Sequence, residues 1–168
     1  MEPQTRKKNH MRREFHPLLL AQMRNYPQIR LITADLGYKM WDNIAAEFPD
    51  RFTNCGASEQ LMLGMGVGMA LEGLVPICYS ITPFLLKRPY EWIDNYLNHE
   101  QIPVKLLGGG RGKDYAHDGY SHDASKDWQV LATCPNIAQF YPESVSELPE
   151  MIHAWLHHCG PAYLNLKR

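Results

Sequence analysis

The sequence of 168 residues lacks long apolar runs, an excess of one charge and a dense set of cysteines. No apolar segment approaches the roughly 20 residues that a membrane-spanning helix needs, and the basic start lacks the apolar core of a secretory signal. The net charge of −1 gives no electrostatic reason to expect nucleic acid. We therefore expect a soluble protein that binds neither membrane nor nucleic acid.

The cysteines also exclude some classes of site. Cys55, Cys78, Cys134 and Cys159 form no C-x-x-C pair and lie in segments that read as apolar or helical. This pattern predicts reduced, buried thiols in a cytoplasmic protein, with a disulfide as the alternative.

What is present fits one ordinary folded domain. The hydrophobic fraction is 45% and the charged fraction 21%, which excludes a disordered chain. No internal repeat or low-complexity linker divides the sequence. We expect a single domain over residues 1–168, with residues 1–10 as a loose polar extension.

Predicted strands and helices alternate along the chain. The expected strands are residues 29–34, 51–54, 75–80, 103–107, 137–141 and 162–166. The expected helices are residues 11–25, 41–48, a run that starts at 59, 84–100, 124–133 and 144–158. This alternation predicts an α/β fold with a doubly wound, mostly parallel sheet and helices on both faces.

The helix that begins after Ser58 differs from an ordinary surface helix. Ser58 is a good N-cap, and the following residues are apolar or glycine, so we expect a helix that is buried almost all round. Glu59 is the only charged residue until Glu72. Apolar surroundings tend to raise the pKa of a carboxyl, which makes Glu59 a candidate functional acid. The alternative is an acidic residue that only helps to start the helix.

Residues 108–123 form a long polar loop, and loops of this length in compact domains are usually functional. Its segment from Gly108 to Lys113 lacks the spacing of a phosphate-binding loop. His117 and His122 have no third ligand at a convincing spacing, so no metal site is expected in this chain.

Four segments in a fixed order carry a resemblance. They are Ala34-Asp-Leu-Gly37, Phe48-Pro-Asp-Arg-Phe52, the helix of Glu59, and Asp118-Gly-Tyr-Ser-His-Asp123. Over about residues 30–168 the sequence resembles the pyrimidine-binding domain of transketolase and 1-deoxyxylulose-5-phosphate synthase. No single segment is decisive, but their order and spacing together are specific.

The resemblance assigns roles around thiamine diphosphate. The position of Glu59 implies a catalytic carboxyl that hydrogen-bonds to the cofactor's aminopyrimidine and activates it. Phe84 matches the phenylalanine on which the pyrimidine stacks, although a core phenylalanine is an equal alternative. Arg88 matches an arginine of the deoxyxylulose synthases and is expected beside the cofactor, facing the substrate.

The resemblance also assigns residues to the substrate. Asp118 and His122 match residues that contact the oxygens of the donor sugar, with His122 also catalytic, and Arg111 and Arg168 match substrate-contacting arginines. The alternative is a surface loop that simply carries polar groups. The loop departs from the family pattern at His117, Tyr120 and Asp123, so the donor is expected to differ from ordinary ketose phosphates.

The sequence has no G-D-G motif, which marks the family's diphosphate- and Mg²⁺-binding domain. The resemblance therefore implies one subunit of a split enzyme, whose partner binds Mg²⁺ and the diphosphate. The expected reaction transfers a ketol or acyl unit between small ketones and aldehydes. Two alternatives stay open: a subunit of a two-chain 2-oxo-acid decarboxylase, and a non-catalytic paralogue with a binding or regulatory role.

Overall fold

The computed structural model describes residues 11–168, so the extension expected at residues 1–10 lies outside the described part. Six strands form a parallel sheet in the order β2-β1-β3-β4-β6-β5. The strands are β1 (Ile29–Thr33), β2 (Phe52–Asn54), β3 (Val75–Ile81), β4 (Lys105–Gly109), β5 (Ala138–Phe140) and β6 (Ala162–Leu166). The predicted α/β fold with a parallel sheet is confirmed.

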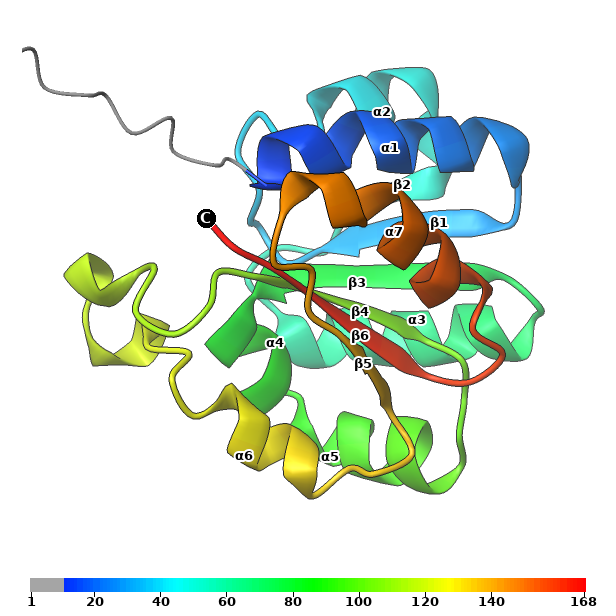
Figure 1. Ribbon diagram of the computed structural model, residues 1–168. Coiled ribbons are helices and arrows are strands. Elements are labelled where there is room, and N and C mark those ends of the chain that lie inside the picture. The colour runs from blue at the N-terminus through cyan, green and yellow to red at the C-terminus, as the bar shows by residue number, and fades with distance from the viewer. Residues whose placement is uncertain (1–10) are drawn as a thin grey trace, which may run out of the picture.

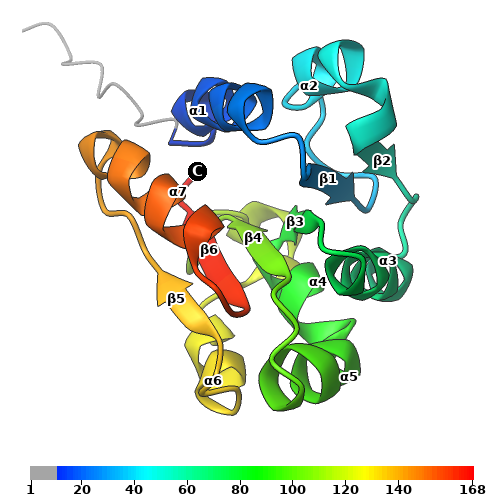
Figure 2. The ribbon, with the colours of Figure 1, turned by 90° about the vertical axis from the view of Figure 1, so that its right-hand side faces the viewer.

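Helices cover both faces of the sheet (Figures 1 and 2). One layer consists of α1 (Met11–Asn25), α2 (Asp42–Glu47) and α7 (Leu148–His157). The other consists of α3 (Glu59–Leu71), α4 (Thr82–Lys87), α5 (Tyr90–Trp92) with the π-helical segment Ile93–His99, and α6 (Asp127–Ala132). Each layer has its own apolar core against the sheet.

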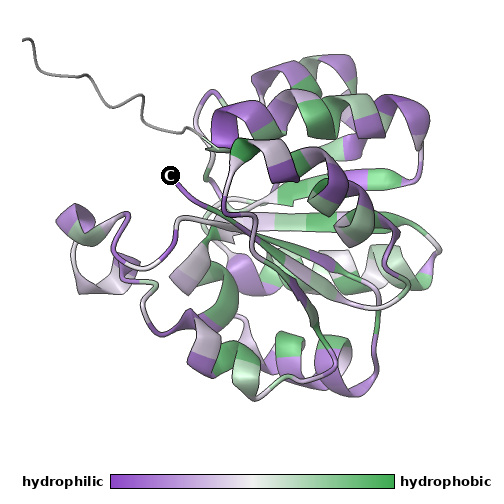
Figure 3. Ribbon diagram, in the orientation of Figure 1, coloured by the Kyte–Doolittle hydropathy of each residue, from purple (hydrophilic) through white to green (hydrophobic). Residues whose placement is uncertain are grey.

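The central strands contribute to the apolar cores on both faces of the sheet, because each face packs against helices. Figure 3 shows hydrophobic residues along these strands. Helix α1 buries one stripe at helical spacing, with Phe15, Leu19 and Met23 each 0% exposed. The bounds predicted for this helix, residues 11–25, are those observed.

The helix predicted over residues 84–100 is interrupted. Helix α4 ends at Lys87, and the next helix, α5, begins at Tyr90 after Pro89. Proline lacks the N–H that a continuous helix requires and crowds the preceding turn, which explains the break. The strand predicted from residue 103 begins at Lys105 and runs to Gly109.

Helix α3 corrects two expectations. It is buried on one face only, because Leu61 is 52% and Leu71 is 69% exposed on the side that has no neighbour within the described residues. Ser58 precedes the helix, but its side chain makes no capping hydrogen bond. The apolar sequence therefore predicted more burial than residues 11–168 provide.

The expected burial of the cysteines is also only partly correct. All four are free, and Cys78 and Cys134 are buried, but Cys55 is half-buried and Cys159 is exposed. None of the helices formed by residues 11–168 is both long and apolar enough to span a membrane.

The sheet topology marks one edge as the place for a site. The strand order reverses between β1 and β3, and ligands of open α/β sheets bind beyond the carboxyl ends of the strands at such a point. The chain between β4 and α6 projects beyond this edge (Figure 1).

Candidate functional site

The proposed site residues follow different strands but reach the same edge of the sheet. Glu59 comes after β2, Phe84 and Arg88 after β3, His122 after β4, and Arg168 after β6. Since all six strands are parallel, their carboxyl ends lie together. The fold thus gathers residues that are more than one hundred positions apart.

Glu59 opens α3 and is 3% exposed. Arg88 Nη1 lies 2.9 Å from both carboxyl oxygens, and the Ser80 hydroxyl donates to Oε1 at 3.3 Å. We expected apolar surroundings for this carboxyl, but a guanidinium and a hydroxyl contact it. A carboxyl removed from water needs such partners if it is to carry charge.

Arg88 also connects Glu59 to an aromatic pair. Its guanidinium carbon lies 3.7 Å from the centroid of the Phe84 ring, in the range of a cation–π contact. The ring of His122 meets Phe84 edge-on, with centroids 4.8 Å apart and planes at 65°. These contacts link four side chains in a continuous series. We call Glu59, Arg88, Phe84 and His122 the Glu59 group.

Phe84 does not belong to either apolar core and is half-buried. Its ring contacts a cation and an imidazole, which are unusual neighbours for a residue that only fills a core. The Arg88 guanidinium contacts both this ring and the Glu59 carboxyl, so one cation links the aromatic ring to the acid.

Asp118 and Arg168 lie apart from the Glu59 group. Asp118 pairs with His117 at 3.3 Å, and Arg168 Nη1 lies 3.1 Å from His117 Nε2. Within residues 11–168, no side-chain contact joins Asp118 to His122. The structure therefore brings together some of the predicted site residues and leaves Asp118 and Arg168 as a second group.

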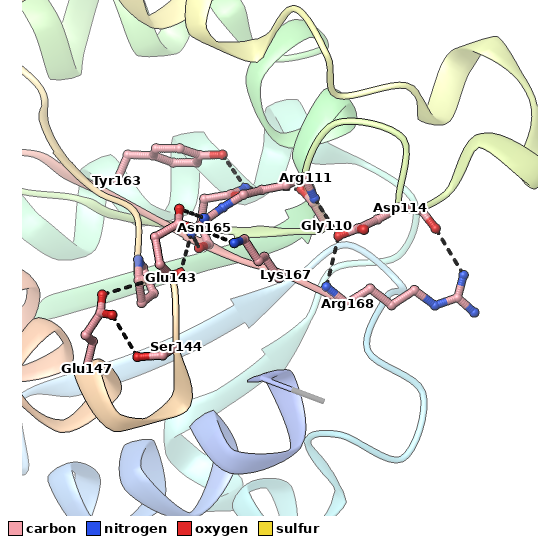
Figure 4. Close-up of polar contacts among 11 residues, drawn as sticks. Gly110, Arg111, Asp114, Glu143, Ser144, Glu147, Tyr163, Asn165, Lys167 and Arg168 are labelled. Atoms are coloured by element: carbon pink, nitrogen blue, oxygen red, sulfur yellow. Dashed lines mark hydrogen bonds and ion pairs between the residues drawn. The ribbon is translucent and has the colours of Figure 1, made fainter. Parts of the chain in front are cut away.

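Arg111 is 16% exposed, and its hydrogen bonds are made inside the chain. Its Nε and Nη1 donate at 2.6 Å to Asn165 Oδ1 and to Glu143, and its Nη2 donates to the carbonyls of Pro142 and Asn165 (Figure 4). These bonds tie Arg111 to β6 and to the segment of Pro142 and Glu143, and its contact with the substrate stays a prediction.

A basic cleft of about 670 Å³ lies at the same edge, at the switch between β1 and β3. Arg12, Arg13, His16 and Lys39 line it, and none of its described lining residues is acidic. Tyr115 also lines it. The Tyr115 hydroxyl and His16 Nε2 are buried without a hydrogen-bond partner in the described chain.

Burial raises the pKa of Tyr115 and lowers that of His16, so both side chains are neutral near pH 7. The guanidinium carbons of Arg12 and Arg168 lie 5.6 Å and 4.9 Å from the Tyr115 ring centroid. Two cations therefore contact one phenol ring, and the Asp114 carboxylate lies close enough to contribute to the raised pKa of Tyr115. The cleft has the chemistry of an anion-binding site with neutral hydrogen-bonding groups.

The sequence did not indicate this cleft, because Arg12 and Arg13 lie in the basic segment at its start. The signal that could have found it is topological. Lys39 follows the first predicted strand, and the end of that strand is the switch point of the expected sheet.

The loop after β1 that borders the cleft has a strained backbone. Asp35 and Lys39 have positive φ values of 56° and 58°, in a region that residues with side chains rarely adopt. The Asn54 side chain bonds to both the backbone N–H and the carboxylate of Asp35. Such strain persists only when neighbours hold it, and it is common at ligand sites.

The comparisons with known proteins agree with the fold and with the resemblance. The family described as "Transketolase, pyrimidine binding domain" matches residues 7–168. A transketolase C-terminal section from Methanocaldococcus jannaschii is 29% identical over 159 residues, covering 94% of this chain and 50% of that protein.

Two further relatives come from enzymes that are divided between chains. One of the subunits of the apulose-4-phosphate transketolase of Actinobacillus succinogenes is 33% identical over 120 residues, or 71% of this chain and 39% of that protein. A solved structure described as a split-gene transketolase in an inactive beta4 tetramer superposes with a TM-score of 0.81 at 26% identity, covering 94% of this chain and 51% of that one. The chain spans about half the length, or less, of these relatives. It belongs to the transketolase pyrimidine-binding domain family.

Proposed function

We propose that this chain is the pyrimidine-binding subunit of a split, thiamine diphosphate-dependent transketolase-like enzyme that transfers a ketol or acyl unit between carbonyl compounds. When bound, the cofactor supplies an electron sink that lets a carbon–carbon bond beside a carbonyl break and form. The observation that carries the proposal is the buried Glu59 carboxyl, fixed beside the half-buried Phe84 ring at the carboxyl edge of the sheet.

Glu59 would hold a ring nitrogen of the pyrimidine, and Phe84 would support the face of that ring. The fit is reasonable because Arg88 and Ser80 fix the carboxyl while its oxygens retain lone pairs for a further hydrogen bond. A carboxyl at this position can donate or accept a proton at the nitrogen it touches, which is general acid–base catalysis.

His122 would contact an oxygen of the donor ketone. Its ring is held against Phe84, so the imidazole stays close to the surface that we assign to the cofactor. Asp118 and Arg168 would bind parts of the donor further from the reacting carbon. Arg111 would contribute by fixing the loop that carries Asp118 and His122.

The basic cleft supports an anionic substrate. Among the described residues, the lining holds cations and no acidic side chain, and a carboxylate or phosphate group would supply a counter-charge. The relative from A. succinogenes is named for a sugar phosphate, which agrees with this assignment. We therefore propose that the substrate carries a phosphate group, bound at the cleft while its carbonyl reacts near Glu59.

A partner chain would bind the diphosphate and Mg²⁺. Within residues 11–168, no group of three or more His, Cys, Asp or Glu side chains is placed to hold a metal ion. The relatives described as a C-terminal section, a transketolase subunit and a split-gene protein support an enzyme divided between chains. The four free cysteines suit a reducing compartment, and we propose the cytoplasm.

The proposal is tested by calorimetry with thiamine diphosphate and Mg²⁺. The isolated chain should show no measurable binding, because it would contact only the pyrimidine half of the cofactor. Its complex with a co-purifying chain that contains G-D-G should bind the cofactor in a Mg²⁺-dependent manner. Tight, Mg²⁺-dependent binding by the isolated chain would overturn the split site, and a complex that never binds the cofactor would overturn the enzymatic role.

A further inference from the structure

Asn165 is a fully buried polar residue in the last strand, β6, and the proposed chemistry does not use it. Its side chain lies where β4, β6 and the start of α4 meet, at the carboxyl edge of the sheet. Figure 4 shows it between Tyr163 and Arg111. A buried amide is costly unless its hydrogen bonds are made, so its partners indicate why it is there.

The amide of Asn165 satisfies both its donor and its acceptor side. Nδ2 lies 2.8 Å from Thr82 Oγ1, 2.7 Å from the Tyr163 hydroxyl and 3.2 Å from the Gly110 carbonyl. Oδ1 accepts from Arg111 Nε at 2.6 Å. Because a guanidinium can only donate, this contact fixes which end of the amide is oxygen.

Two of these partners belong to the segments that carry Phe84 and His122 of the Glu59 group. Thr82 is the first residue of α4, which contains Phe84. Gly110 begins the loop that leads to His122, and the Thr82 hydroxyl donates to the Gly110 carbonyl at 2.7 Å. Asn165 thus connects the start of α4 to Gly110, where the loop of residues 110–123 begins. We call this loop the donor loop, because it carries Asp118 and His122.

The space around this junction is filled. A Cβ atom added at Gly108 would lie 2.6 Å from the Tyr163 hydroxyl, 2.8 Å from Thr82 Oγ1 and 2.9 Å from Asn165 Nδ2. The strand therefore needs glycine at this point, and the polar atoms cannot shift without displacing each other. The junction is packed as tightly as a core although its groups are polar.

This loop is held mainly at its ends: Asp114 Oδ2 accepts from the backbone N–H groups of Arg111 and Arg168, and the Ala124 N–H donates to the Gly112 carbonyl. The segment of residues 116–121 is exposed, and the loop's deeply buried side chains are Tyr115 and Ala124. The edge contact of His122 with Phe84 is the point where the loop meets α4. The orientation of His122 therefore depends on how the root of the loop is held.

We propose that Asn165 is a positioning residue, which sets the distance between His122 and Phe84 by tying Gly110 and Arg111 to Thr82. The proposal rests on the function proposed above, because that function gives His122 and Phe84 their roles. The geometry that it concerns is a property of the isolated chain, so it can be measured without cofactor or partner.

The test compares Asn165→Asp and Thr82→Val, which keep the side-chain shape and lose hydrogen bonds, with the conservative control Thr82→Ser. Asn165→Asp keeps an acceptor for Arg111 but cannot donate to Thr82, Tyr163 or Gly110. Thr82→Val keeps the shape and loses the hydroxyl, whereas Thr82→Ser keeps the hydroxyl. Proton and carbon NMR spectra of the isolated chain report the His122 ring, whose shifts are displaced by the ring current of Phe84.

In Asn165→Asp and Thr82→Val, the His122 signals should move towards the values of the exposed His99, while Thr82→Ser should retain the wild-type signals. Leu164→Val, in the buried apolar part of β6, is a matched control that weakens the core without touching the junction, and it too should leave His122 unchanged. Fold integrity of the Asn165 and Thr82 variants is checked by the signals of Trp155, which lies with Leu164 in the core on the face of the sheet opposite to Tyr163.

Folded Asn165→Asp and Thr82→Val proteins with wild-type His122 signals would overturn the proposal, and so would equal displacement in Leu164→Val. In the active complex, Thr82→Val should lower kcat/KM for the donor by about 10- to 100-fold through misplacement, with Thr82→Ser near wild type. If the NMR changes occur but no complex binds thiamine diphosphate, the proposed function is wrong, whereas the positioning role of Asn165 still holds.

Discussion

The Glu59 group and the basic cleft lie at the same edge of the sheet and differ in how their charges are balanced. In the Glu59 group, the buried carboxylate is paired with Arg88 at 2.9 Å. The cleft is lined by Arg12, Arg13 and Lys39, and none of its described lining residues is acidic. The first region has its counter-charge within the chain, whereas residues 11–168 place no acidic side chain in the lining of the second.

This difference separates two tasks. The Glu59 carboxyl is paired with a cation and held in place, so it does not need a charged ligand to balance it. Such a carboxyl can exchange a proton with a neutral ring nitrogen, which suits catalysis. Unpaired cations repel each other until an anion arrives, and that repulsion is relieved by binding. We therefore assign chemistry to the Glu59 group and substrate anchoring to the cleft.

The largest expected effect comes from Glu59→Gln, which removes the acid–base function and keeps the shape of the side chain. In the complex with the partner chain, C2–H exchange of bound thiamine diphosphate should slow by about 10²- to 10⁴-fold, as for loss of a general acid–base group. Exchange is followed by NMR after transfer to D₂O.

Binding of inorganic phosphate to Glu59→Gln should equal that of wild type, because the change lies outside the cleft. An unchanged exchange rate in an intact complex would return Glu59 to a structural role at the start of α3.

A smaller effect is expected from Arg12→Met, which removes one cation from the cleft. Loss of one charge-assisted hydrogen bond should raise the Kd for inorganic phosphate by about tenfold. The isolated chain is titrated with phosphate, and the NMR shifts of the amides of residues 37–39 report binding at the cleft.

Arg24→Met is the matched control, because Arg24 is exposed and pairs with Glu47 on the surface away from the cleft. Equal weakening in both variants would mean that phosphate responds only to overall charge. If wild type shows no saturable binding of phosphate, the cleft is not an anion site.

Local patterns were enough to predict most of the fold. The stripe of Phe15, Leu19 and Met23 defined α1 to the residue, and alternation of strands and helices gave the sheet. What failed depended on tertiary context. The sequence of α3 is apolar all round, but only its neighbours decide which face is covered, and Leu71 is left exposed.

The site shows the same limit. Glu59 and Phe84 could be proposed from the sequence because they lie in motifs of contiguous residues, and their roles stay predictions. The partnership of Glu59 with Arg88, 29 positions away, and of Arg111 with Asn165, 54 positions away, could not be predicted, because folding alone brings these side chains together. The basic cleft was missed because its cations come from α1 and from the loop after β1.

A third kind of cation lies at the opposite edge of the sheet and sharpens the comparison. Lys105, at the start of β4, is 2% exposed, and its Nζ donates to the carbonyls of His158 and Gly160 at 2.6 Å and 2.8 Å. Backbone dipoles, rather than an acid or a ligand, balance this charge. We therefore expect Lys105 to affect stability and not binding.

Burial lowers the pKa of Lys105 to about 8, from 10.5 in an exposed lysine. Below about pH 8 the amine is protonated in both the folded and the unfolded chain, and the folded state carries the full cost of the buried charge. Between about pH 8 and 10.5 the unfolded chain binds more protons, so the Lys105 contribution to the free energy of unfolding rises with pH.

This contribution is measured as a difference, because other groups titrate in the same range with the opposite sign. Burial raises the pKa values of Cys78, Tyr79 and Tyr163, so their contributions to stability fall as pH rises. The difference in the free energy of unfolding between wild type and Lys105→Met, measured with urea at several pH values, cancels these shared terms.

The wild-type free energy of unfolding should rise relative to that of the variant between about pH 8 and 10.5, while both proteins keep the same affinity for phosphate. A difference independent of pH would show that Lys105 is solvated when folded, and a change in phosphate affinity would show that the two edges of the sheet are coupled.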